Sequence, residues 1–160
     1  MIQRIQSVFL LLIALCMVAF LFLPIWSKTD AETGTSATLT AFSLTQTATA
    51  GTEAAATSTN TIAIAILAIL AGAVAIYEIF QYKSRLTQMK LGMLNTLLMA
   101  ALLGTTVYYA YYVGEEMIKG APGEREAAFY LPFLALLLNA LANRFIRRDE
   151  QLVRSVDRLR

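Results

Sequence analysis

Residues Ile5–Ile25 read IQSVFLLLIALCMVAFLFLPI, a run without a single charge. As a helix these residues would extend about 31 Å, which matches a bilayer hydrocarbon core of about 30 Å. Three further apolar runs cover 61–80, 91–113 and 127–143, and Glu78 is the one charged residue in them. We therefore predict an all-α membrane protein: a bundle of four transmembrane helices followed by a cytoplasmic amphipathic C-terminal helix.

The composition agrees with a chain that is partly dissolved in lipid. Of its 160 residues, 58% are hydrophobic and 15% are charged, whereas soluble domains are about 45–50% apolar and about 25% charged. We expect a single membrane domain over residues 1–160. The net charge of +2 is too small to suggest a nucleic-acid partner.

The residue types exclude much of the familiar catalytic chemistry. The chain has no histidine and one cysteine, Cys16, which lies inside the first apolar run. Neither Ser–His nor Cys–His nucleophile pairs can be built, and a histidine metal site is excluded as well. We expect no enzyme activity, no metal and no cofactor.

The first apolar run is interpreted as a retained helix rather than a cleaved signal peptide. Its apolar core is longer than that of a signal peptide, and the segment Phe22–Trp26 (FLPIW) contains no small-x-small cleavage site.

The distribution of basic residues predicts the orientation. Ten of the thirteen lie in the N-terminus, the 81–90 connection and the C-terminal tail: Arg4, Lys83, Arg85, Lys90, Arg144, Arg147, Arg148, Arg154, Arg158 and Arg160. The other side carries Lys28, Lys119 and Arg125 together with most of the acids. Because basic loops stay in the cytoplasm, we expect both termini there.

The connection over residues 27–60 is the one long loop, and we place it outside the cytoplasm. It is rich in threonine and alanine and has few large apolar side chains. Disorder and a small β element over Thr38–Thr45, where the residues favour strands, are equally supported. The second outer loop, Gly114–Glu126, is short and acidic. Tyrosines at 108, 109, 111 and 112 are interpreted as part of an interfacial aromatic belt rather than as a ligand cage.

Four polar side chains within the spans are candidate functional residues: Glu78, Asn95, Asn139 and Asn143. Three of them lie near the cytoplasmic interface and Asn139 lies one turn deeper. Hydrogen bonding between helices, worth about 0.6 kcal/mol per contact, is the favoured interpretation. A proton or cation relay is the alternative.

The tail from Asn143 reads NRFIRRDEQLVRSVDRLR and has apolar residues at helical spacing. Its candidate partner-docking residues are Leu152, Val153, Val156 and Leu159 with Arg154 and Arg158. Attachment to anionic lipid and docking on a protein partner are equally supported.

Both ends of the chain carry recognisable motifs. The start MIQRIQS and the end RRDEQLVRSVDRLR, together with the segment Arg85–Asn95, resemble an uncharacterised four-helix membrane family of Bacteroidota. Members of that family typically start with MIQRIQ and end in a stretch like DE-LVRS-DRLR. The resemblance implies an inner-membrane location and brings neither an activity nor site residues.

The leading hypothesis is a non-enzymatic accessory or scaffolding subunit of a larger membrane complex, acting through helix packing and its tail. The expected partners are the lipid bilayer and other membrane subunits or further copies of the chain. The alternative is a small oligomeric transporter or channel that uses Glu78 and the intramembrane asparagines.

Overall fold

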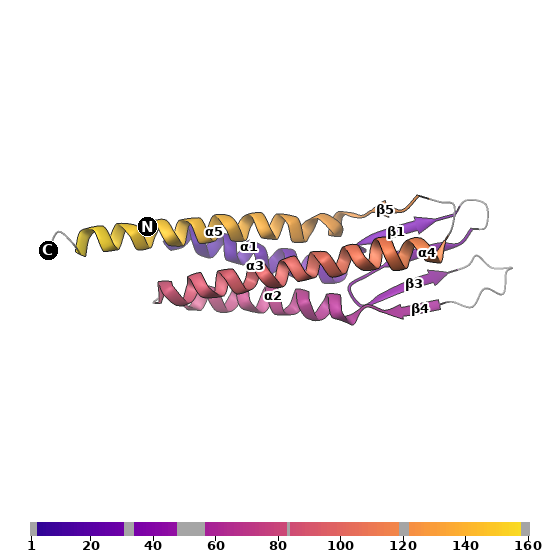
Figure 1. Cartoon of the computed structure of the whole chain (residues 1–160), viewed down its shortest axis with the longest axis horizontal. Coiled ribbons are helices and arrows are strands. Elements are labelled where there is room, and N and C mark those ends of the chain that lie inside the picture. The colour runs from indigo at the N-terminus through magenta and orange to yellow at the C-terminus, as the bar shows by residue number, and fades with distance from the viewer. Residues whose placement is uncertain (1–2, 31–33, 48–56, 83, 119–121, 158–160) are drawn as a thin grey trace.

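The computed structural model describes residues 3–30, 34–47, 57–82, 84–118 and 122–157. Long helices form most of it, and short strands gather at one end (Figure 1). The long helices are α1 (Gln3–Phe22), α2 (Ile62–Phe80), α3 (Arg85–Tyr108) and α5 (Ala127–Asp157). The π-helical turn η1 (Tyr109–Gly114) and the short helix α4 (Glu115–Met117) continue α3 without a break in the chain.

The four long helices pack as a ring. Helix α1 contacts α2 and α5, and α3 contacts the same two helices from the opposite corner. Each of the four is long and apolar enough to cross a membrane, which confirms the predicted four-helix bundle at that level. Helix α1 begins and α5 ends at the same end of the bundle (Figure 1). We call it the arginine-rich end, after Arg144, Arg147 and Arg148, and the opposite one the sheet end.

Small residues on two helices have different roles. Ala68, Gly72 and Ala75 on α2 are buried, and a Cβ atom on Gly72 would stand 3.4 Å from Met17 Cβ on α1. This face is therefore used inside the bundle. Gly104 on α3 is exposed and has no neighbour within 4 Å of such a Cβ. Gly104 therefore faces away from the bundle.

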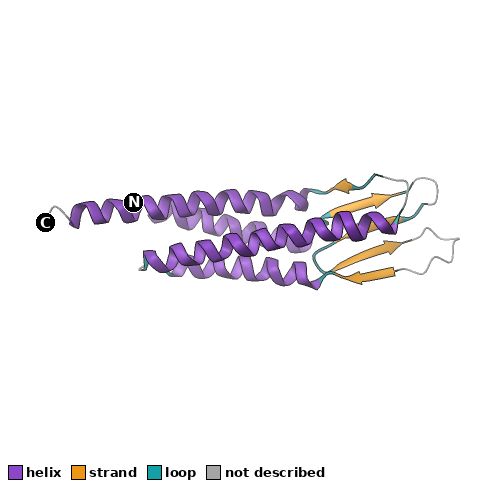
Figure 2. Cartoon of the chain, viewed as in Figure 1, coloured by secondary structure: helices purple, strands orange, loops and turns teal. Residues whose placement is uncertain are grey.

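A five-stranded antiparallel sheet covers one end of the bundle (Figure 2). Its order is β4-β3-β2-β1-β5, formed by β1 (Trp26–Thr29), β2 (Ser36–Leu39), β3 (Ser43–Thr47), β4 (Thr57–Asn60) and β5 (Glu124–Arg125). The expectation of an all-α protein is therefore wrong at this end. The short threonine and serine segments have the β-branched residues that strands favour.

The predicted β element over Thr38–Thr45 is the hairpin of β2 and β3, in which Leu39 pairs with Leu44. Both leucines are fully buried, as are Ala37 and Ala41. The sheet thus has one apolar face, and this face packs toward the helices, with β2 contacting η1. Disorder is the wrong alternative for the described strands, and residues 31–33 and 48–56 lie outside the described part.

Hydrogen bonds join the sheet directly to the helix ends. Ile25 N donates to Leu39 O (2.8 Å), and Glu126 N donates to Ile25 O (3.1 Å) just before α5 begins. Thr61, which precedes α2, donates from its hydroxyl to Thr40 O (3.1 Å). The strands therefore continue the helices rather than forming a separate unit.

Trp26 lies at the centre of this joint and is almost completely buried. A Cβ atom on Gly114 would stand 2.9 Å from its ring, and one on Gly123 would stand 2.7 Å from its Cε2 atom. Only glycine therefore fits at these two positions without a shift. Beside the ring, the buried Lys28 Nζ pairs with Glu115 Oε2 at 2.7 Å, which ties β1 to α4.

The connection between the second and third spans is shorter than predicted. Arg85 and Lys90, assigned to the connection between the second and third spans, lie within α3, and the connection shrinks to residues 81–84. Helix α5 continues without interruption from the fourth apolar run into the basic tail, as predicted for the tail helix.

Candidate functional site

Glu78 lies in the last turn of α2 and is completely buried. Neither of its carboxylate oxygens has a hydrogen-bond partner within the described residues. Its backbone oxygen accepts a hydrogen bond from Gln88 Nε2 on α3 (3.1 Å). Arg85 pairs with Asp149 rather than with Glu78.

Asn95 on α3 is also completely buried, and both polar atoms of its amide are unpaired within the described part of the chain. It belongs to a buried stripe with Gln88, Gly92 and Met99. These positions follow helical spacing, so they share the face of α3 that looks into the bundle.

Asn139 connects α5 to α3. Its Nδ2 atom donates to Gly92 O (2.9 Å) and to Thr96 Oγ1 (2.8 Å). One turn further along α5, the side chain of Asn143 covers Gly92, where a Cβ atom would stand 2.7 Å from Asn143 Cγ. The glycine therefore allows both asparagines to approach the α3 backbone. The expectation of interhelical hydrogen bonding is correct for Asn139.

An ion pair fastens the projecting part of α5. Arg85 Nη2 lies 3.1 Å from Asp149 Oδ2, and Arg85 Nη1 donates to Asp149 O (2.9 Å). Gln6, Ser7 and Gln88 line a narrow hollow beside this pair. The N-terminal, Arg85–Asn95 and C-terminal segments on which the family resemblance rests therefore meet at this point.

The arrangement gathers unpaired polar groups in one region. Besides Glu78 and Asn95, unpaired buried atoms among the described residues are found on Gln6, Asn139 and Asn143. Buried polar groups are ordinarily hydrogen-bonded, and each unpaired one costs about 1–3 kcal/mol. A buried carboxyl group can hold or release a proton, and the amides can donate to or accept from a ligand. This end of the bundle is the candidate site.

The tail residues are only partly described. Leu152 on α5 is 48% exposed. The backbone is helical through Asp157, but the side chains of Val153, Arg154 and Val156 lie outside the described part, as do Arg158 and Leu159 entirely. No group of three His, Cys, Asp or Glu residues placed for a metal occurs among the residues that the structure describes.

Two of the four tyrosines at the sheet end have exposed side chains. The rings of Tyr108 and Tyr112 stack with centroids 5.7 Å apart, and both side chains are exposed. The Tyr111 hydroxyl accepts a hydrogen bond from Arg125 Nε, and this bond raises the pKa of the guanidinium. The exposed rings fit a belt on the outside of the bundle.

Several members of the site were not identified from the sequence: Gln6, Gln88, Gly92, Thr96 and the Arg85–Asp149 pair. One signal was available, because Gln88, Gly92 and Asn95 follow an i, i+4, i+7 pattern. The ion pair had no local signal, because its partners are 64 residues apart.

The chain belongs to the family described as Domain of unknown function (DUF4293), whose model matches residues 2–159. No curated protein matches the sequence.

Proposed function

We propose that this protein is a multi-pass subunit of a bacterial inner membrane, with both termini in the cytoplasm and no enzymatic activity of its own. Its role is that of an accessory or scaffolding subunit, which holds a partner protein at the cytoplasmic surface through the end of α5. The four apolar helices, and the ten basic residues in the N-terminal, 81–90 and C-terminal segments of the sequence, support this placement.

The length of α5 carries the proposal. Its 31 residues extend about 46 Å, whereas a hydrocarbon core is about 30 Å thick. The surplus of about three turns projects at the arginine-rich end, where α5 runs on beyond α2 and α3 (Figure 2). A rigid helix that leaves the membrane is a ready attachment point for a partner.

Contacts within the bundle fix the direction of this projection. The Arg85–Asp149 pair holds α5 to the first turn of α3, and the Phe9 and Phe145 rings stack α1 on α5 with centroids 5.7 Å apart. Leu152 follows Asp149 by about one turn and is half exposed. An apolar side chain on a helix held in this way can bind a partner with little loss of conformational entropy.

The test compares two leucines at the same end of the bundle. Leu152→Asp places a charge on the projecting helix, and Leu86→Asp makes the same change on α3 at a leucine of similar exposure (56%). Membranes with each tagged variant at native abundance are solubilised in mild detergent and run on a native gel. We expect wild type and Leu86→Asp to migrate above the purified chain's own mass, and Leu152→Asp to migrate at that mass. Equal migration of all three contradicts the proposal.

Glu78 supports a second candidate function, a small oligomeric transporter or channel. Its buried carboxyl group without hydrogen-bond partners is of the kind that proton relays use. Purified wild-type protein in vesicles should then carry a proton or cation flux, and Glu78→Gln should abolish it. Vesicles without any wild-type flux would exclude this function.

A further inference from the structure

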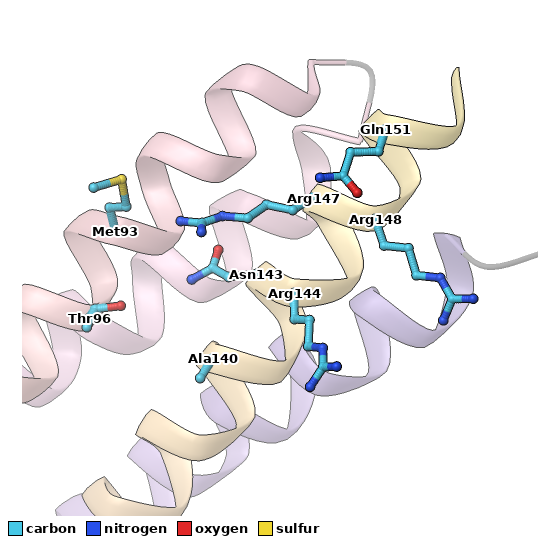
Figure 3. A pocket seen from close by; sticks show the side chains of 8 residues that line it. All are labelled: Met93, Thr96, Ala140, Asn143, Arg144, Arg147, Arg148 and Gln151. Carbon is cyan, nitrogen blue, oxygen red and sulfur yellow. The ribbon is translucent and has the colours of Figure 1, made fainter. Parts of the chain in front are cut away.

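A hollow of about 710 Å³ opens between α3 and α5 at the arginine-rich end (Figure 3). Met93 and Thr96 of α3 form one wall, and side chains from about three turns of α5, from Ala140 to Gln151, form the other. The hollow lies on the side of the bundle. Asn143 and Thr96 are the residues that it shares with the candidate site described above.

Three guanidinium groups line this hollow: Arg144, Arg147 and Arg148. Arg147 reaches from α5 toward α3 beside Met93, while Arg144 and Arg148 extend along the opposite side of α5 (Figure 3). Neither of the ion pairs found among the described residues uses any of the three. Guanidinium forks match the oxygens of a phosphate group and bind it with charge-assisted hydrogen bonds.

The wall below the arginines is apolar and continues toward the sheet end. Met93 is 63% exposed, and one turn beyond the hollow Leu97 on α3 and Leu137 on α5 are 71% and 65% exposed. A soluble anion would leave this surface uncovered. An amphiphile with a phosphate head and hydrocarbon chains covers both parts at once, because its head meets the arginines while its chains lie along the leucines.

We propose that this hollow binds the phosphate headgroup of an anionic phospholipid, with Arg147 at the phosphate, Arg144 and Arg148 adding positive charge from the other side of α5, and the acyl chains along Met93, Leu97 and Leu137. Gln151, at the outer rim of the hollow, supplies an amide that can donate to a headgroup oxygen. This site rests on the membrane placement proposed above and is independent of any protein partner.

Binding is measured by native mass spectrometry of the purified full-length chain in neutral detergent, titrated with phosphatidylglycerol or with phosphatidylcholine. The test variant is Arg144→Gln combined with Arg147→Gln. Its control is Lys90→Gln combined with Arg125→Gln. Both residues are exposed and neither lines the hollow, so this control removes the same number of positive charges elsewhere on the protein.

We expect wild type to prefer the anionic lipid and the test variant to bind it at least about tenfold more weakly, as expected when hydrogen bonds to a charged group are lost. The control should change the affinity by less than about threefold, the range of weak, exposed charge interactions. Equal weakening in both variants, or equal binding of the two lipids, overturns the proposal. Displacement of the lipid by millimolar inorganic phosphate identifies a soluble-anion site and overturns it as well. Because no partner protein is present, the outcome is separate from that of the native-gel experiment.

Discussion

At the scale of single residues, the bundle combines close packing with polar groups that have no partner. Gly92 lets Asn139 and Asn143 reach the α3 backbone, whereas Glu78 and Asn95 are buried without hydrogen bonds among the described residues. The first arrangement stabilises the contact of α3 with α5. The unpaired groups of Glu78 and Asn95 lower stability. Mutation of the first arrangement should therefore destabilise the protein, and mutation of the second should stabilise it.

Gly92→Ala should destabilise the bundle by about 1–3 kcal/mol, because the new methyl group must displace the Asn143 amide. Gly104→Ala on the same helix should be neutral or stabilise by up to about 1 kcal/mol, since its surroundings are open. Thermal unfolding in mild detergent measures both. Adding Asn143→Ala should restore most of the stability lost in Gly92→Ala, and a failure to do so would place the strain elsewhere.

Glu78→Met should raise the free energy of unfolding by about 1–3 kcal/mol, because it replaces an unpaired buried carboxyl group with an apolar side chain of similar length. Glu116→Met, at an exposed carboxylate of α4, should change it by less than about 0.5 kcal/mol. The same unfolding assay serves for both variants. A destabilised Glu78→Met would mean that the carboxyl group makes a stabilising contact.

At the scale of elements, α5 is held to the bundle at separate points along its length. Asn139 bonds α3 near the middle, Phe145 stacks on Phe9 of α1, and Asp149 pairs with Arg85. The Arg85–Asp149 pair decides how firmly the projecting turns are positioned, because no other helix of the bundle runs beside α5 over its full length (Figure 1).

Removing either partner of the Arg85–Asp149 pair should loosen the end of α5. Arg85→Met and Asp149→Asn should each increase amide hydrogen exchange over residues 150–157, and the double variant should exchange no faster than the more affected single one. The coupling energy from this cycle should be about 1 kcal/mol, because both side chains remain partly exposed. A coupling near zero would show that α5 is fixed by its apolar contacts alone.

The helices were predictable from the sequence because uninterrupted apolar runs are long enough to decide the fold without knowledge of their neighbours. The strands were harder to predict from the sequence. Strands β4 and β5 hold four and two residues, and each pairs with a segment far away in the chain or across a loop. The site was predicted in part: Glu78, Asn95, Asn139 and Asn143 were named, but the role of Gly92 depends on which α5 residue faces it. Sequence spacing along one helix does not contain that information.

At the scale of the whole molecule, the two ends differ in chemistry. The sheet end is built from threonine-rich strands and carries the Lys28–Glu115 pair, while the arginine-rich end carries the unpaired polar cluster and the projecting helix. This polarity along the long axis (Figure 1) is what the proposed orientation in a membrane requires.

Cysteine labelling tests this orientation directly. In a Cys16→Ala background, Thr47→Cys at the exposed end of β3 and Gln151→Cys on α5 place one thiol at each end. A membrane-impermeant maleimide should label Thr47→Cys in intact spheroplasts and Gln151→Cys only after lysis, because basic segments remain in the cytoplasm. The reverse pattern, or labelling of both in intact spheroplasts, would refute the orientation.

The position of Trp26 has an optical consequence. It is the one tryptophan in the chain, and it is enclosed between the sheet, η1 and Gly123. Its emission spectrum therefore reports the solvation of the sheet-end joint, whereas far-ultraviolet ellipticity reports mainly the helices. Thermal unfolding followed with both signals at once distinguishes a local opening of the joint from the unfolding of the helical bundle. The measurement needs no attached dye.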